Sequence, residues 1–172
     1  AKNYTASLDK SIKGLKIGLL KEGFGHPIAM PEVDECVRKA AKQLASLGAT
    51  VEEVSVPEHF SGLAIWGAIV TDGFWQSLKL NGLGYNYDGV YSPSLFHAMA
   101  NVMSRVSEMP INARLIMLLG KYMERYKGQY YAKAKNHVHG LTAAYDKAFE
   151  KYDLLLMPTT VRTACENPAS LA

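Results

Sequence analysis

A strand, a helix and a second strand follow one another within residues 15–56, and this order constrains the fold more than any other feature. Apolar residues alternate with polar or small ones over 15–20 and again over 51–56, which is the two-residue period of a strand. Apolar residues at helical spacing separate the two over 32–47. Strands joined by one helix are parallel with a right-handed crossover, so the pattern predicts an α/β fold with a βαβ unit.

The helix predicted over 32–47 has recognisable ends. Pro31 stands where the first turn begins, acidic residues fill that turn, and Gly48 follows the last turn. This order complements the helix dipole and matches a glycine-terminated end. Cys36 falls among the apolar positions, so we expect it to be buried as a small apolar side chain.

The rest of the chain is mainly helical until one last apolar run. Residues 60–152 carry apolar side chains at helical spacing, with a loop rich in Gly, Asn and Tyr at 81–89. Residues 153–159 are continuously apolar before a proline, which is typical of a core strand buried on both faces. Residues 1–13 are polar and irregular, which predicts a linker. Three strands make a poor sheet alone, so we expect 1–172 to be a single fragment of a larger domain with a mixed sheet.

The composition excludes several classes of protein. With 48% apolar residues and a net charge of +3 over 172 residues, the chain is globular rather than disordered. Its longest apolar stretch, 62–70, is too short to span a bilayer, so we expect no membrane association. Lys and Arg are spread along the chain, and we therefore expect no nucleic-acid partner. Two cysteines and no export signal favour a reducing, cytoplasmic location.

No motif in the chain carries an evident reaction. The glycine-rich loop at 23–28 lacks the third glycine of a dinucleotide site, and Pro27 removes a backbone donor, so a plain turn is favoured. His137 and His139 are two residues apart, which places them on different faces of a helix and argues against a metal site. His59 has no sequence partner, and no Ser-Ser pair or Gly-x-Ser-x-Gly elbow occurs. We therefore predict no catalytic residue, metal or cofactor in this segment.

Aromatic residues leave two interpretations open. Trp66 and Phe74 lie at helical spacing, which usually indicates a core, and a loop with Tyr85 and Tyr87 follows. The same side chains could also form the wall of a pocket for an apolar ligand.

Read as a whole, the chain resembles the amidase signature family, and most of all the amidases linked with nitrile hydratase. The resembling residues span nearly the whole chain in the family's order: 14–26, 31–34, 48–54, 65–66, 71–73, 81–84 and 152–159. The resemblance implies an α/β/α fold and places the chain in the middle-to-late part of such an enzyme. Residues 161–166 depart from the proline-bearing stretch usual in the family.

The resemblance also implies a function. Family members hydrolyse carboxylic acid amides to the acid and ammonia through a serine acyl-enzyme, with a lysine and a bridging serine handling protons. Those motifs lie upstream of the matched part, so this chain would supply scaffold and part of the acyl pocket, with Trp66 contacting the substrate. Implied partners are a small amide and the remainder of the amidase chain, and a homodimer is left open. The alternative is a non-catalytic binding or regulatory module that kept the amidase scaffold.

Overall fold

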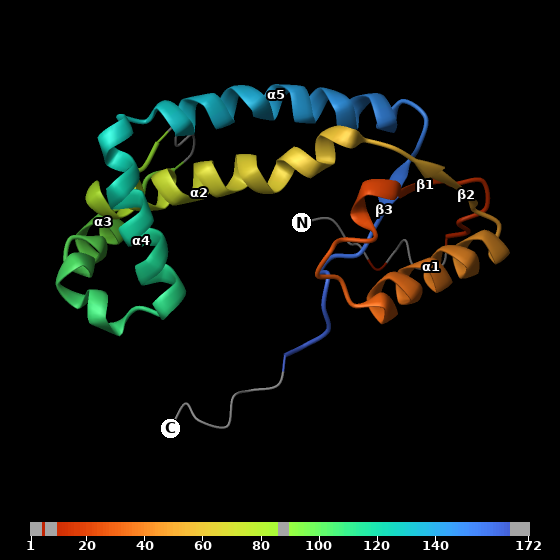
Figure 1. The fold of residues 1–172 in the computed structure, drawn as a ribbon, viewed down its shortest axis with the longest axis horizontal. Coiled ribbons are helices and arrows are strands. Elements are labelled where there is room, and N and C mark those ends of the chain that lie inside the picture. Colours follow the sequence, from red (N-terminus) through yellow and green to blue (C-terminus); the bar gives the residue numbers. More distant parts are fainter. Residues whose placement is uncertain (1–4, 6–9, 86–89, 166–172) are drawn as a thin grey trace. The chain divides into compact units, whose positions relative to one another are not determined.

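The chain forms two compact units in a computed structural model that describes residues 5, 10–85 and 90–165 (Figure 1). The first unit combines Ala1–Phe60 with Thr142–Ala172, and the second is Ser61–Leu141. Most of the predicted linker at 1–13 lies outside the described residues.

The first unit is built on three parallel strands. They are β1 (Lys16–Leu20), β2 (Thr50–Val54) and β3 (Leu154–Leu156), in the sheet order β2-β1-β3. Ile17 of β1 pairs with Val51 of β2 and with Leu154 of β3. The α/β class and the βαβ unit are thereby confirmed, and both strand pairs of the described sheet are parallel.

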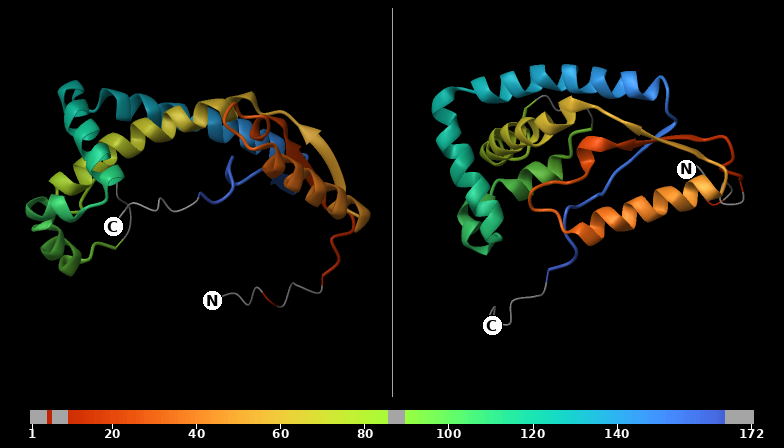
Figure 2. Two further views of the ribbon diagram at one scale, coloured as in Figure 1. Left: turned by 60° about the horizontal axis from the view of Figure 1, so that its bottom comes forward. Right: turned by 45° about the vertical axis from the view of Figure 1, so that its right-hand side comes forward.

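Alternation along β1 directs its side chains to two different helices. Leu19 lines a hollow together with Val51 and with Ala41 of α1 (Pro31–Ser46), which covers this face (Figure 2). Leu20 is fully buried on the other face, where it clusters with Ala148 of α5 (Gln129–Phe149). The two-residue period of a strand therefore places one helix on each face of the sheet.

Gly18 allows the close approach of the strands on the second of these faces. A Cβ atom at this position would lie 2.7 Å from Cγ1 of Val54 and 2.8 Å from Cδ2 of Leu155. Two hydrogen bonds also close the start of the β1–β3 pair, because Lys16 N–H donates to the Asp153 carboxylate and Asp153 N–H donates to the Lys16 carbonyl, both at 2.8 Å.

Two predicted burials differ in the structure. Cys36 is exposed, because it lies at the edge of the apolar stripe of α1 rather than on it, and the prediction of a buried cysteine was wrong. In β3, Leu155 and Leu156 are half-buried, but Leu154 is 51% exposed. β3 is an edge strand of the described sheet, so no further strand covers Leu154 there.

The second unit is helical. It contains α2 (Gly62–Lys79), α3 (Pro93–Met99), α4 (Ile111–Met123) and the first part of α5. Four short 3₁₀ segments complete the described chain: η2 (Lys21–Gly23), η3 (Pro57–Ser61), η4 (Val102–Glu108) and η5 (Glu124–Tyr126). Of the described helices, none is long and apolar enough to cross a bilayer.

The core of the second unit lies between α2 and α4. Trp75, Leu78 and Met117 are buried there, with half-buried side chains from α3 and η4 around them. Gly120 sets the distance between the helices, since a Cβ atom would lie 2.4 Å from Cβ of Trp75. The predicted helices 115–131 and 132–152 in fact meet earlier, where Lys127 and Gly128 adopt positive φ angles between η5 and α5.

Candidate functional site

Polar side chains of the first unit gather just beyond the carboxyl ends of β1 and β2. Glu22 follows β1, and Ser55 and Val56 follow β2. The Glu22 carboxylate accepts hydrogen bonds from Ser55 Oγ and, at 2.9 Å, from the backbone N–H of Val56. Carboxyl ends of parallel strands are where open α/β sheets bind their ligands, so this edge is the first place to look for chemistry.

Hydrogen bonding decides the charge state of Glu22. Burial alone would raise the pKa of this carboxyl, because it disfavours the charged form. The bonds from Ser55 and Val56 outweigh burial, and the pKa of Glu22 lies below its ordinary value. Glu22 is therefore ionised at neutral pH and acts as a hydrogen-bond acceptor rather than as a proton donor.

His59 and Tyr145 form a second polar pair in the same unit. His59 Nδ1 lies 2.6 Å from the Tyr145 hydroxyl, and the two rings meet edge-on with centroids 6.3 Å apart. Burial, together with the negative charge of Glu22, raises the pKa of Tyr145. The phenol therefore keeps its proton at neutral pH, and it can donate to His59 or accept from it.

These two pairs do not make an activated nucleophile. Ser55 donates to a carboxylate of lowered pKa, which is a weak base, and His59 bonds to Tyr145 rather than to Ser55 in the described part of the chain. Sequence reasoning missed both pairs because their members are 33 and 86 residues apart. The only available signal was the position of Glu22 and Ser55 after two predicted parallel strands.

An open groove of about 480 Å³ adjoins this polar edge. It runs between the end of β2, with Ser55 and Val56, and the end of α5, with Ala148. Lys151 and Tyr152 close its far side, and both donate to Glu52. The volume is in the range of small-ligand pockets.

The glycine-rich loop at 23–28 is occupied by contacts of its own. Gly25 N–H donates to the carboxylate of Asp34 at 2.8 Å, so a side chain of α1 takes the place that an anion would need. A Cβ atom at Gly23 would lie 2.6 Å from Cβ of Met157, which shows why a glycine is required there. The loop thus joins strand and helix and packs against the end of β3.

Trp66 lies on α2 in the second unit, and its side chain is 58% exposed. Leu63, one turn earlier, is 71% exposed, so the two form an open apolar surface. Trp66 is therefore not a core residue among the described residues, in contrast to Trp75 on the same helix. Its predicted role in substrate binding stays a prediction, and Tyr87 of the aromatic loop lies outside the described residues.

Asp72 is a buried acidic residue in the second unit that sequence reasoning did not single out. The residue is 1% exposed, and neither its Oδ1 nor Nε1 of nearby Trp75 has a hydrogen-bond partner within the described ranges. Burial, and then the negative charge of Asp72, raises the pKa of Tyr85. A buried carboxyl oxygen without a partner is costly, which marks this part of α2 as polar in an otherwise apolar core.

The remaining candidates do not converge on a site. His137 and His139 are exposed on α5. No group of three His, Cys, Asp or Glu side chains that could hold a metal occurs among residues 5, 10–85 and 90–165. One Ser-x-x-Lys spacing runs from Ser7 to Lys10, but Ser7 lies outside the described residues.

Sequence comparison places the chain. The family model described as Amidase matches residues 1–169. An enantioselective amidase of Rhodococcus rhodochrous is 36% identical over 169 residues, which cover 96% of this chain and 32% of that protein. The amidase-type component of a glutamyl-tRNA(Gln) amidotransferase from Synechococcus is also 36% identical, over 94% of this chain and 33% of the relative. The chain thus spans about a third of the length of these relatives.

Solved structures agree with the fold. A bacterial aryl acylamidase of the amidase signature enzymes has a TM-score of 0.63 at 22% identity, over 97% of this chain and 31% of that structure. The corresponding glutamyl-tRNA(Gln) amidotransferase component of Thermotoga maritima has a TM-score of 0.59 at 20% identity, over 94% of this chain and 30% of that structure. The parallel βαβ unit with its helical second unit is thus part of an amidase-signature α/β fold. With the family model matched along nearly its whole length, the chain belongs to the Amidase family.

Proposed function

We propose that the protein containing this chain is an amidase, which hydrolyses carboxylic acid amides to the acid and ammonia. The match of the Amidase family model over residues 1–169 is the observation that carries the proposal. In the proposed reaction a serine hydroxyl attacks the amide carbonyl, ammonia leaves, and water then hydrolyses the acyl-enzyme.

We place the nucleophilic serine and its proton-transfer partners outside residues 1–172. The relatives are about three times as long as the matched segment, which leaves room for these groups. Within the described residues, Ser55 is held by the weakly basic Glu22 and so is a poor nucleophile. In this proposal the two compact units are parts of one amidase-family domain.

The proposed contribution of this chain is scaffold together with part of the acyl pocket. The buried strand β1 supplies the rigid element, and Trp66 supplies an exposed aromatic side chain on α2. An exposed tryptophan next to Leu63 can offer an apolar wall to the acyl group of an amide. A small amide as substrate, a cytoplasmic location and a homodimer belong to the same proposal.

The test is ammonia release by the purified full-length protein from amides of increasing acyl size. Activity that is abolished when the signature serine is replaced by alanine is the expected result. The 172-residue chain alone is expected to release no ammonia, because it contains no Ser-Ser pair. A full-length protein that binds amides without hydrolysing them would contradict the proposal and favour the non-catalytic module. Hydrolysis by the 172-residue chain would refute the placement of the catalytic groups.

A further inference from the structure

Helix α4 presents an apolar row on the side that faces away from α2. Its members follow at spacings of four, three and four residues and are 54–74% exposed: Ile111, Leu115, Leu118 and Tyr122. Met117 and Gly120 occupy the opposite side, where they pack on α2. Such spacing places the row along one line of the helix, which is the pattern of a surface that packs against another helix.

Positive charge accompanies this row. Arg114 lies one turn before Leu118 on the helix surface, and Arg125 continues the line of the row beyond Tyr122. Neither Arg114 nor Arg125 has a carboxylate within 4 Å in the part of the chain that the structure describes. Both guanidinium groups therefore keep an unneutralised charge next to the apolar row.

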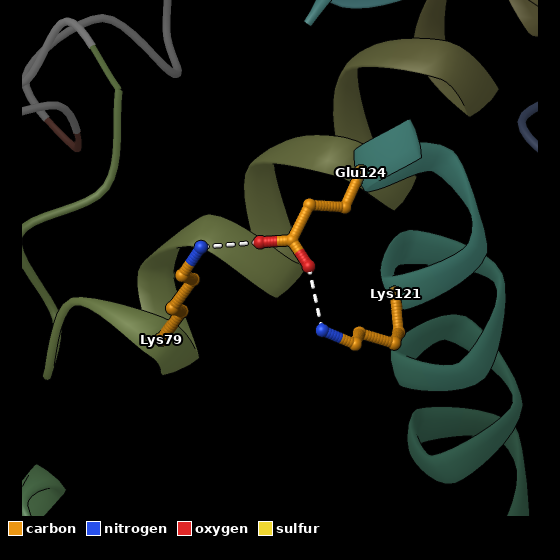
Figure 3. A network of polar contacts seen from close by, with 3 residues as sticks. All are labelled: Lys79, Lys121 and Glu124. Atoms are coloured by element: carbon orange, nitrogen blue, oxygen red, sulfur yellow. Dashed lines mark hydrogen bonds and ion pairs between the residues drawn. The ribbon is translucent and has the colours of Figure 1, made fainter. Parts of the chain in front are cut away.

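A single carboxylate serves two ammonium groups at the end of the same helix. Glu124 accepts from Lys79 of α2 through one oxygen and from Lys121 of α4, at 2.7 Å, through the other (Figure 3). One negative charge thus balances only one of the two lysines. Residues 121–135 contain five Lys or Arg and one Glu, a formal charge of +4, whereas the whole chain carries +3. The excess positive charge of the chain is concentrated beside the exposed row.

We propose that this outer face of α4 (Ile111, Leu115, Leu118 and Tyr122 with Arg114 and Arg125) docks an amphipathic helix of a partner protein whose apolar ridge is bordered by Asp and Glu. The apolar row supplies the buried contact, and the unpaired guanidinium groups select carboxylates at the rim. This inference goes beyond amide hydrolysis and does not depend on it.

A second copy of the chain fits this surface less well than an acidic helix does. In an antiparallel pair of α4 helices, Ile111 would face Tyr122 and Leu115 would face Leu118. Arg114 of one copy would then lie beside Lys121 of the other, so that like charges meet at the rim. In a parallel pair, Arg125 would face its own copy. Charge complementarity therefore favours a partner of opposite charge.

The experiment uses the full-length protein and two designed fluorescent peptides of about 21 residues, long enough for a stable amphipathic helix. Both peptides carry the same leucine ridge, with glutamate at the rim positions of one and lysine at those of the other. Fluorescence anisotropy is expected to show binding of the glutamate peptide at least about tenfold tighter than binding of the lysine peptide. The difference should shrink as salt rises from about 50 to about 500 mM, because rim charges are screened.

Two variants and a matched control test the location. Leu118→Ser interrupts the apolar row, and Arg125→Glu reverses the charge that continues it. Each is expected to weaken binding of the glutamate peptide at least about tenfold. Lys39→Glu makes the same charge change at an exposed residue of α1 and is expected to alter binding less than about twofold. Circular dichroism of every variant confirms that the fold is kept.

Three outcomes would overturn the proposal. Equal affinity for both peptides would show that charge does not select the partner. A concentration-dependent dimer that Leu118→Ser abolishes would assign the face to a second copy. A Leu118→Cys variant of the full-length protein that does not react with maleimide would show that the chain itself covers this face.

Discussion

The carboxylate of Glu22 accepts the hydroxyl hydrogen bond of Ser55 across the gap between the ends of two neighbouring parallel strands. The same carboxylate also accepts the N–H of Val56 at 2.9 Å, so one side chain ties the end of β1 to the first residues after β2. The floor of the groove next to Ala148 is formed by the segment that Glu22 holds. Loss of this link is therefore expected to loosen the carboxyl edge of the sheet.

Glu22→Gln is expected to lower the free energy of unfolding by about 1 kcal/mol at pH 7, because hydrogen bonds to a charged acceptor are stronger than neutral ones. The pKa of Glu22 is lowered by folding, so its contribution is present above the ordinary value of 4.5 and is lost as pH falls below that value. Urea denaturation of both proteins between pH 3 and pH 8 measures the difference.

The control for this pH dependence is Glu150→Gln. Glu150 is exposed after the end of α5, and its carboxylate has no hydrogen bond to any described residue. This variant is expected to change stability at pH 7 by less than about 0.5 kcal/mol. A difference between wild type and Glu22→Gln that stays constant from pH 8 to pH 3 would contradict the proposed role of the charge.

Two helical glycines give a second prediction, with opposite signs. Gly120→Ala places a methyl group 2.4 Å from Cβ of Trp75 and 2.6 Å from the Thr71 carbonyl oxygen, so α2 and α4 must separate. We expect a loss of about 1–3 kcal/mol from this overpacking. Gly140→Ala meets no atom within 4 Å and should stabilise α5 by about 0.5–1 kcal/mol. Thermal unfolding of both variants decides, and equal effects would refute the close packing at Gly120.

The sheet could be predicted from the sequence because its signals are local. Alternation over 15–20 and 51–56, with one helix between them, is sufficient for two parallel strands, and the run at 153–159 contains the observed β3. Burial was less predictable. Cys36 lies at the edge of an apolar stripe, where a small shift decides between core and solvent. Leu154 is open because the partner of an edge strand is not encoded in the strand itself.

The polar contacts of the candidate site could not be predicted in the same way. His59 acquires its partner from Tyr145, 86 residues further on, only once α5 returns to the sheet. Helix ends were also misplaced, since the break between α4 and α5 depends on the positive φ of Lys127 before Gly128 rather than on an apolar pattern. Such features arise from tertiary packing, which a single sequence does not specify residue by residue.

The shared carboxylate of Glu124 gives a third prediction. Hydrogen bonds from Lys121 and then Lys79 lower the pKa of Glu124 to about 2. Lys121→Met is expected to raise this pKa more than Lys79→Met does, and the double variant should bring it close to 4.5. Carboxyl-detected NMR titration measures each value.

The control for this titration is Lys127→Met, which removes a nearby ammonium group that forms no ion pair with Glu124 in the described structure. It is expected to leave the pKa of Glu124 nearly unchanged. An unchanged pKa in the double variant would contradict the network in Figure 3.

Trp66 provides the prediction that bears most directly on the proposed amidase. Its 58% exposed ring can be lost without opening a core in this chain, so Trp66→Ala is expected to leave the melting temperature nearly unchanged. In the full-length enzyme the variant should lower kcat/KM for aromatic and longer aliphatic amides by about 1–3 kcal/mol, and much less for acetamide, because a methyl group barely reaches the ring. Phe149→Ala, which removes a 49% exposed aromatic side chain from α5, is the matched control and should not change the dependence on acyl size. An equal fall for every amide, together with a lowered melting temperature, would assign Trp66 to packing and remove it from the acyl pocket.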